Sequence, residues 1–411
     1  MKRPDPFRDV SVMNKLPRAV LLTAALLVAA CQDTSTPLQP GGPPAAIGLP
    51  GLPGASAARY IVVFNDGVSD PIGLAQTLVA TYNGSLLHTY TAALQGFAAT
   101  LPDAAVPLLR LEPLVAYVEP DQTIRADGTE NMDANGDPWG LDRIDQQALP
   151  LSGTYTYTSD GAGVQAYIID TGIWTMHPDF GGRADEVYDV ASVLGINGQD
   201  CNGHGTHVAG TVGSATYGVA KGVFLHGVRV FAGCLGTGFA SDVIAGVDWV
   251  AANHQSPAVA NMSIAEQGTD DALNTATTNL VNSGVFVAVA AGNYSVDACG
   301  YSPGNAPGAF TVAASTKTDA AASFTDFGPC VQIYAPGDAI KSTWILNGTQ
   351  VLSGTSMATP HVVGVAALYK ATFGDAPYTT VGAWITNNAT SGAITGNPGG
   401  TPNLLLFKSS L

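Results

Sequence analysis

Residues 353–361 read Ser353-Gly354-Thr355-Ser356-Met357-Ala358-Thr359-Pro360-His361 and lead into a long apolar run. The run predicts a helix over Thr355–Thr372 that Gly374 ends. Pro360 is compatible with this helix if it lies in the first turn, where a missing N–H has no intrahelical partner. Ser356 then stands at the start of a buried helix. It is either an N-cap or a nucleophile whose backbone N–H and helix dipole face a developing negative charge.

Outward from this helix, apolar strands alternate with longer amphipathic helices from Trp139 onward. The expected strands are Val164–Ile169, Leu225–Phe231, Val259–Ile264, Val285–Ala290, Phe310–Ala314 and Val331–Tyr334. The other expected helices are His204–Ser214, Ala240–Asn253 and Asp270–Asn282. This alternation predicts an α/β fold in which a mostly parallel sheet carries helices on both faces. Active residues in such sheets gather at the carboxyl ends of the strands.

Two further segments carry chemistry. Ile168-Ile169-Asp170-Thr171-Gly172 closes an apolar strand with a carboxylate, which is costly to bury unpaired. Asn202-Gly203-His204-Gly205-Thr206-His207-Val208-Ala209-Gly210 places a histidine between glycines at a helix start, without the HExxH spacing of zinc proteases. Taken alone, the first segment would be interpreted as a turn cap and the second as a structural pair of histidines. Together with Ser356, the order Asp170, His204, Ser356 is one of three unrelated chain orders known for Ser-His-Asp hydrolysis.

The three segments resemble the three signatures of the subtilase family of serine proteases, and the resemblance covers nearly all of Trp139–Leu411. Trp139-Gly140-Leu141-Asp142-Arg143-Ile144-Asp145-Gln146 is similar to the mature N-terminus of aqualysin-like members of the proteinase K branch. The resemblance implies a subtilisin-like three-layer fold. It also implies a secreted serine endopeptidase that hydrolyses proteins through an acyl-enzyme and needs no cofactor for catalysis.

The same resemblance assigns the catalytic roles. Asp170, His204 and Ser356 form the triad: the imidazole takes the hydroxyl proton, and the carboxylate holds the imidazole tautomer. The backbone N–H of Ser356 and Asn293, which ends Ala290-Ala291-Gly292-Asn293, are expected to form the oxyanion hole. Losing one such donor typically costs about 3–4 kcal/mol of transition-state stabilisation.

Peptide substrate is expected to bind as an added strand, with backbone pairing for affinity and pockets for preference. By resemblance, the cleft is lined by Leu235, Gly236, Thr237, Gly238, Ser263, Ile264, Ala265, Ala291 and Gly292. The family's Asn-Met-Ser-Leu-Gly-Gly here reads Asn261-Met262-Ser263-Ile264-Ala265-Glu266. The methyl of Ala265 narrows the primary pocket, and Glu266 adds a negative charge at its rim. We therefore expect broad specificity with an apolar or small P1 residue.

Five cysteines occur. Without Cys31, an even set of Cys201, Cys234, Cys299 and Cys330 remains, which in an exported chain indicates disulfides. Four cysteines allow three pairings. We favour Cys201–Cys234 and Cys299–Cys330, and the resemblance to aqualysin-like enzymes supports this choice.

Structural calcium is a further expectation from the resemblance. Asp142, Asp145, Gln146 and Ser152 resemble the N-terminal calcium site of aqualysin-like enzymes, and a set of caps and surface charges is the alternative. A second site of proteinase K relatives uses an aspartate where this chain has Gln332, so we do not expect that site.

The N-terminus indicates export. Lys15 and Arg18 precede the apolar run Ala19–Ala30, which suits the h-region of a signal peptide over residues 1–31. A lipobox ending at Cys31 and an ordinary cleavage site at Val28-Ala29-Ala30 fit equally well. The protein is thus expected to be secreted, with its precursor either free or lipid-anchored through Cys31. Residues 32–58 are a Pro/Gly-rich linker.

Residues 59–126 predict a compact α+β unit, ahead of a peptidase domain over residues 127–411. Its expected elements are strands Arg59–Phe64, Leu86–Tyr90, Gly96–Leu101 and Val115–Val118 and helices Ile72–Tyr82 and Thr100–Arg110. Tyr60–Phe64, Gly96–Ala99 and Tyr117–Glu119 resemble the inhibitor-type propeptide of these proteases, which is ferredoxin-like. The resemblance implies an intramolecular inhibitor and a first self-cut within Arg125–Met132. Asp127–Asp137 is polar and contains glycine, which predicts a linker or a cleavage region.

The composition limits the alternatives. The chain has 411 residues, of which 46% are hydrophobic and 12% charged, and a formal net charge of -16. A disordered chain is excluded, and the acidity disfavours nucleic acid and anionic lipid as partners. The mature enzyme is expected to be a soluble monomer that acts on proteins or peptides without stable membrane insertion. A non-catalytic binding protein and an esterase are the rivals. The unsubstituted triad argues against the first, and a strand-binding cleft against the second.

Overall fold

The computed structural model describes residues 57–65, 67–91, 95–120, 128–190 and 198–411. The predicted signal peptide lies outside these residues, and so does nearly all of the linker. The described chain forms two compact units, residues 57–120 and residues 128–411. The predicted domain boundary, between residues 126 and 127, falls in the gap between them. Within the described ranges, no helix combines the length and the apolar character needed to span a bilayer.

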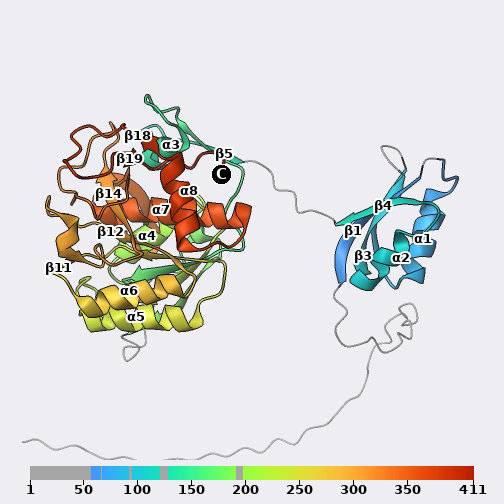
Figure 1. The fold of residues 1–411 in the computed structure, drawn as a ribbon, viewed down its shortest axis with the longest axis horizontal. Coiled ribbons are helices and arrows are strands. Elements are labelled where there is room, and N and C mark those ends of the chain that lie inside the picture. Colours follow the sequence, from blue (N-terminus) through green and yellow to red (C-terminus); the bar gives the residue numbers. More distant parts are fainter. Residues whose placement is uncertain (1–56, 66, 92–94, 121–127, 191–197) are drawn as a thin grey trace, which may run out of the picture. The chain divides into compact units, whose positions relative to one another are not determined.

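The first unit is an antiparallel sheet covered by helices on one face (Figure 1). Its elements are β1 (Ala57–Phe64), α1 (Pro71–Thr81), β2 (Ser85–Tyr90), β3 (Gly96–Pro102), α2 (Val106–Leu109) and β4 (Val115–Pro120). The sheet order β2-β3-β1-β4 gives the expected ferredoxin-like arrangement. Val62 and Phe64 of β1 pack with Phe97 of β3 against Leu78 of α1.

Two predicted elements of the N-terminal half differ from the structure. The predicted helix Thr100–Arg110 is wrong at its start, because Leu101 still belongs to β3 and pairs with Ala58. Leu101 precedes Pro102, and a residue before proline is restricted to extended backbone. The predicted linker Asp127–Asp137 contains a strand, β5 (Gly128–Asn131), which pairs antiparallel with β6 (Thr154–Tyr157).

The second unit is built on a nine-stranded sheet in the order β18-β19-β15-β14-β12-β10-β7-β9-β8. Its strands are β7 (Gln165–Asp170), β8 (Ala184–Asp189), β9 (Phe224–Arg229), β10 (Ala258–Met262), β12 (Phe286–Ala290), β14 (Phe310–Ser315), β15 (Ile333–Pro336), β18 (Thr390–Ser391) and β19 (Leu404–Leu405). All neighbours are parallel except β18 and β19. The mostly parallel sheet is thus confirmed, and the six predicted strands are β7, β9, β10, β12, β14 and β15.

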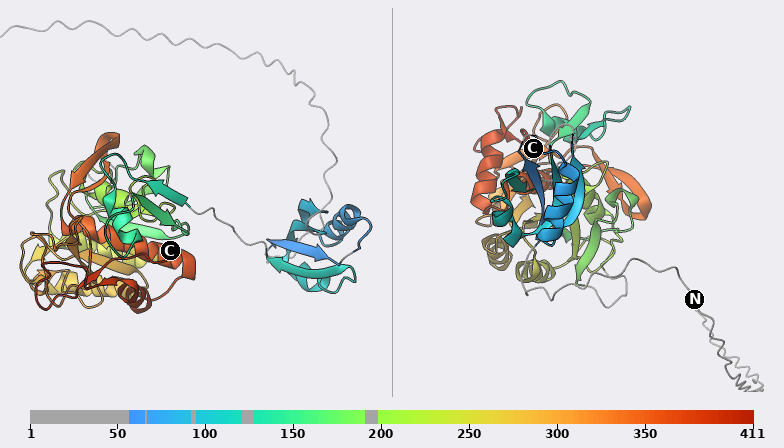
Figure 2. Two further views of the ribbon diagram at one scale, coloured as in Figure 1. Left: turned by 90° about the horizontal axis from the view of Figure 1, so that it is seen from above. Right: turned by 90° about the vertical axis from the view of Figure 1, so that its right-hand side faces the viewer.

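Helices cover both faces of this sheet, which makes three layers (Figures 1 and 2). One face carries α3 (Trp139–Asp145), α4 (His204–Gly213), α7 (Thr355–Phe373) and α8 (Tyr378–Asn388), and the other carries α5 (Ala240–Asn253) and α6 (Asp271–Asn282). Alternate residues of β7 show the division. Ala166 and Ile168 pack with α4 and α7, whereas Tyr167 and Ile169 pack with α5 and α6. All four are buried, which explains the uninterrupted apolar run.

Helix α7 contains its proline further along than predicted. The helix begins at Thr355, so Pro360 lies in the second turn rather than the first. A residue with an N–H at this position would bond the carbonyl of Ser356, four residues earlier. The hydroxyl of Ser263 donates to that carbonyl instead, at 2.8 Å. Gly374 ends the helix as predicted. Its φ is 88°, and its N–H donates to the carbonyl of Lys370.

Two disulfides join the predicted cysteines, Cys201 to Cys234 and Cys299 to Cys330. The first ties the segment before α4 to the segment after β9. Asn202 adds a hydrogen bond from its side-chain amide to the carbonyl of Cys234, at 2.9 Å. The bridge therefore fixes the approach to α4.

Removing the first disulfide tests this contribution. The double variant Cys201→Ser/Cys234→Ser, made in a Ser356→Ala chain to prevent self-digestion, should lose about 4 kcal/mol of unfolding free energy in the chain-entropy treatment. Urea unfolding followed by fluorescence measures the loss. The matched control is Cys299→Ser/Cys330→Ser, whose loop is similar at 31 against 33 residues and should give a similar loss. An unchanged midpoint for the first variant would contradict the prediction.

Candidate active site

A buried carboxylate and an imidazole meet at the carboxyl end of β7. Asp170, the last residue of the strand, is fully buried. Its Oδ1 lies 2.8 Å from Nδ1 of His204 and accepts the N–H of Thr171 at 2.7 Å. Its Oδ2 has no hydrogen-bond partner within the described part of the chain. The imidazole of His204 is therefore the main group that offsets the free-energy cost of burying the Asp170 carboxylate.

The loop before α4 places His204 at the first position of the helix. Gly203 precedes it with φ of 110°, and a Cβ there would lie 2.3 Å from the ring of Trp344, so only glycine fits. Asp200 organises this loop from beneath. Its Oδ1 accepts the N–H groups of Asn202 and Gly203, and its Oδ2 accepts the N–H and hydroxyl of Thr206. The sequence analysis did not single out Asp200, although an acidic residue just before a helix start is a capping signal.

The three histidines of this region differ in protonation. Burial lowers the pKa of His204, but the charge and hydrogen bond of Asp170 outweigh burial and raise that pKa above its ordinary value. Burial, together with the nearby His204, lowers the pKa of His207 to about 4. Burial likewise lowers the pKa of His361 to about 4. Of these three rings, His204 is the one equipped to gain and release a proton near neutral pH.

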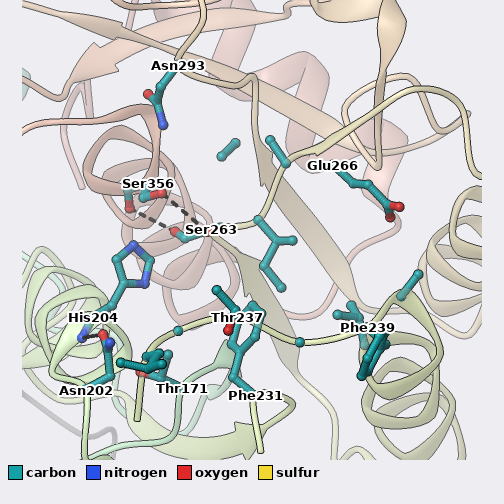
Figure 3. Close-up of a pocket in the computed structure, with 18 of the residues that line it drawn as sticks. Thr171, Asn202, His204, Phe231, Thr237, Phe239, Ser263, Glu266, Asn293 and Ser356 are labelled. Atoms are coloured by element: carbon teal, nitrogen blue, oxygen red, sulfur yellow. Dashed lines mark hydrogen bonds between the residues drawn. The ribbon is translucent and has the colours of Figure 1, made fainter. Parts of the chain in front are cut away.

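Ser356 is the second residue of α7 and lies beside this ring. Figure 3 shows a ring nitrogen of His204 directed toward Ser356. Because Nδ1 is held by Asp170, the nitrogen left for Ser356 is Nε2. The serine hydroxyl donates to the carbonyl of Ser263 at 3.3 Å.

Two N–H donors lie next to the serine. The backbone N–H of Ser356 belongs to the first turn of α7, where such groups have no intrahelical partner. The side-chain oxygen of Asn293 accepts the N–H and hydroxyl of Thr355 at 2.8 and 3.1 Å. Its amide nitrogen is thereby directed into the cleft, as Figure 3 shows. The pair has the arrangement of an oxyanion hole.

A cleft of about 660 Å³ runs past Ser356. Its lining includes two runs of residues, Leu235–Gly238 and Ser263–Glu266. The sequence predicted all of these residues in the lining except Glu266, which was expected at the rim. Ala291 and Gly292 are absent from the lining, where Ala290 and Asn293 appear instead. The sequence analysis missed a set of larger side chains in the lining, namely Phe231, Phe239, Val243, Leu273 and Tyr294. Phe239 is 76% exposed, and an isolated aromatic residue at a helix start gives no sequence signal of its own.

The methyl of Ala265 belongs to the lining of the cleft, whereas Gly292 lies next to it outside the lining. A Cβ placed on Gly292 would lie 3.7 Å from the Cβ of Ala265, which is ordinary van der Waals contact, and 2.1 Å from Oδ2 of Asp326. Glu266, the residue after Ala265, lies further from Ser356 (Figure 3).

The predicted calcium ligands come together only in part. Asp142 accepts the N–H and hydroxyl of Ser152 and the N–H of Gly153, and Gln146 accepts the N–H of Ser152. Asp145 instead bonds Thr156 and pairs with the ammonium of Lys408 at 2.9 Å. All four carboxylate oxygens already accept from protein donors, so these residues do not fit a cation as they stand. Gln332, at the second candidate site, accepts the N–H of Thr311.

A serine at a helix start, a buried Asp–His pair beside it and two N–H donors at a cleft define a serine hydrolase on a parallel α/β sheet. Residues 161–403 match the Subtilase family, and residues 59–127 match the Peptidase inhibitor I9 family. The chain belongs to the subtilase family of serine proteases, which are peptide hydrolases, and carries an inhibitor-type propeptide.

Similar proteins agree with this assignment. The chain is 45% identical to an extracellular serine proteinase of Thermus sp. (strain Rt41A), over 94% of this chain and 98% of the relative. It is 40% identical to proteinase R of Parengyodontium album, over 86% and 89% of the two chains. The crystal structure of a cold adapted subtilisin-like serine proteinase matches with a TM-score of 0.64 and 47% identity, over 66% of this chain and 98% of that one.

The protonation of the three histidines can be measured without catalysis. In a Ser356→Ala chain, NMR of labelled imidazoles should show His204 titrating above its ordinary pKa, while His207 and His361 stay neutral until about pH 4. Asp170→Asn removes the charge that favours the imidazolium, so the pKa of His204 should fall. Protonated His204 cannot accept a proton. The acid limb of the pH–rate profile should therefore move to lower pH in the Asp170→Asn variant that retains Ser356. An unchanged titration of His204 in Asp170→Asn would contradict the assignment.

Proposed function

We propose that this chain is the precursor of a secreted serine endopeptidase whose triad is Asp170, His204 and Ser356. The observation that carries the proposal is the 2.8 Å contact between Asp170 and His204 at the base of a cleft that also holds Ser356. Family membership supports a peptide substrate. Secretion rests on the predicted signal peptide and on the extracellular relative that covers most of the chain.

The reaction follows from the positions of these groups. As Ser356 Oγ bonds to the peptide carbonyl carbon, His204 Nε2 takes the hydroxyl proton and Asp170 stabilises the imidazolium. The carbonyl oxygen becomes an oxyanion, which the Ser356 N–H and the Asn293 amide hold. The imidazolium then gives its proton to the leaving amine as the C–N bond breaks. Water, deprotonated by the same imidazole, releases the acyl group by the reverse steps.

The cleft favours a small or slim apolar P1 side chain. The methyl of Ala265 occupies part of the cleft close to Ser263 and leaves less room for a bulky P1 ring than a glycine at this position would. The carboxylate of Glu266 is exposed on the same segment, and the other lining side chains nearby are apolar. Broad specificity at the remaining positions follows from recognition through backbone pairing.

The N-terminal unit is proposed to act as an intramolecular inhibitor that is removed by the chain's own protease. Its match to the inhibitor I9 family supports the inhibitory role. The first cut is proposed to fall within Arg125–Met132, a range that extends into the second unit and includes β5. Structural calcium at Asp142 and Asp145 is left out of the proposal, because hydrogen bonds and the ammonium of Lys408 already satisfy their carboxylates.

Replacing the nucleophile tests both the chemistry and the maturation. The Ser356→Ala precursor should stay unprocessed, hydrolyse no casein and take up no fluorophosphonate label, because Ser356 is the hydroxyl toward which the ring of His204 is directed. Gel mass, casein hydrolysis and labelling are compared with the wild-type chain. Trace wild-type enzyme should cut the inert precursor, which shows that its cleavage region is accessible. Self-processing of Ser356→Ala in isolation would refute the autocatalytic part, and residual labelling would refute the nucleophile.

Removing the methyl group of Ala265 should shift the P1 preference toward larger side chains. Ala265→Gly removes the methyl that narrows the space, so kcat/KM for a Phe P1 substrate should rise about 10-fold or more relative to an Ala P1 substrate. A peptide library that varies P1 alone measures the ratio. Thr237→Ala, on the opposite wall, is the control and should leave the ratio nearly unchanged. Equal cleavage after Arg and after Ala by the wild-type enzyme would contradict the proposed preference.

A further inference from the structure

A buried aspartate outside the triad lies beneath the oxyanion-hole loop. Asp326 is fully buried in the segment between β14 and β15. The reaction described above gives it no task, and the three family signatures do not include it. Its side-chain carboxyl and its backbone N–H nevertheless both bond the segment that carries Asn293.

Asp326 holds this segment on both sides of Asn293. Its own backbone N–H donates to the carbonyl of Gly292 at 2.9 Å. Its side-chain Oδ1 accepts the N–H of Tyr294 at 2.8 Å and that of Val296 at 3.0 Å. The residue before Asn293 and the residue after it are thus bonded to the same amino acid.

The segment needs such support because it is irregular and lies at the surface. Gly292 has φ of 114° and Ser295 has φ of 58°, so no strand or helix continues through it. Asn293 through Asp297 are exposed, and Tyr294 is 59% exposed. An oxyanion donor must nevertheless stay close to one position, since displacement by about 1 Å costs up to about 100-fold in rate.

The fit between Asp326 and Gly292 is tight. A Cβ on Gly292 would lie 2.1 Å from Oδ2 of Asp326, so the carboxyl packs directly against the glycine backbone. That Oδ2 has no hydrogen-bond partner among the residues that the structure describes, which is an unfavourable arrangement for stability. Burial raises the pKa of Asp326 above its ordinary value, and the backbone N–H groups that its side chain accepts act in the opposite direction.

We propose that Asp326 is the positioning residue of the oxyanion hole and acts through Asn293. The proposal rests on the proposed function, in which Asn293 donates to the oxyanion. Asp326 sets the backbone on each side of Asn293, while Thr355 orients its side chain. The side-chain amide then points at the developing charge from a surface segment that would otherwise move.

Kinetics of three variants test the role. Asp326→Ala removes the side-chain acceptor, and kcat should fall about 10- to 100-fold with KM within about 2-fold, because the misplaced donor matters chiefly in the transition state. Asp326→Asn keeps an oxygen acceptor at the same reach and should restore kcat to within about 3-fold of wild type. Asp297→Ala is the matched control. It removes an aspartate that caps Cys299 in the same exposed segment, away from Asn293, and should leave kcat unchanged.

Asp326→Ser serves as a second removal variant, since it keeps a small polar group but cannot reach Tyr294. All chains are checked by circular dichroism and normalised by active-site titration. Binding of a peptide aldehyde, which places an oxyanion in the hole, should weaken in parallel with kcat. Undiminished aldehyde affinity in both removal variants would overturn the proposal, as would failure of Asn to restore activity.

A double-substitution cycle separates this proposal from the function on which it rests. Asn293→Ala alone should lower kcat about 100- to 1,000-fold. In that background Asp326→Ala should cost less than about 3-fold further, because the donor that it positions is gone. Additive losses would show that Asp326 acts elsewhere and would overturn the positioning role alone. A fully active Asn293→Ala enzyme would instead overturn the oxyanion-hole assignment.

Discussion

The buried charge of Asp170 is the constraint on which the rest of the active site depends. A carboxylate at the end of a strand that is covered on both faces is stable only with a partner, and His204 is that partner. The pairing requires the start of α4 to reach the carboxyl end of β7. Gly203 makes that approach sterically feasible, and Asp200 supplies the hydrogen bonds that hold the loop. The imidazole then presents its other nitrogen to Ser356.

A second junction joins the nucleophile to the substrate cleft. Pro360 removes one helical hydrogen bond and so leaves the carbonyl of Ser356 without a partner inside α7. Ser263 uses that carbonyl as an acceptor, while its own carbonyl accepts the hydroxyl of Ser356 (Figure 3). The wall that contacts substrate is thereby tied to the residue that attacks it. Pro360, which the sequence indicated only as compatible with the helix, thus leaves a carbonyl available for the bond to Ser263.

The sequence predicted what depends on local pattern. Continuous apolar runs identified the six central strands, and the three short segments identified the residues that meet at their ends. Strand β8 was missed because half of its residues are polar, and the helix at Thr100 was wrongly started because Pro102 acts on its neighbour. The contacts of Asp326 and of Lys408 join residues 30 to 263 positions apart, as in Val296–Asp326 and Asp145–Lys408. Such side-chain pairs leave no periodic signal, so the structure was needed to find them.

The two donors of the proposed oxyanion hole are held by different means. The Ser356 N–H is part of a buried helix and cannot move without α7. The Asn293 amide is on an exposed segment, fixed by Thr355 on one side and by the bonds of Asp326 beneath it. The wall at Ala265, in contrast, is anchored through Ser263 to the helix. A substitution at Ala265 leaves the hydrogen bonds of Thr355 and Asp326 to the Asn293 segment in place, while the wall that holds Ala265 stays tied to Ser356 through Ser263.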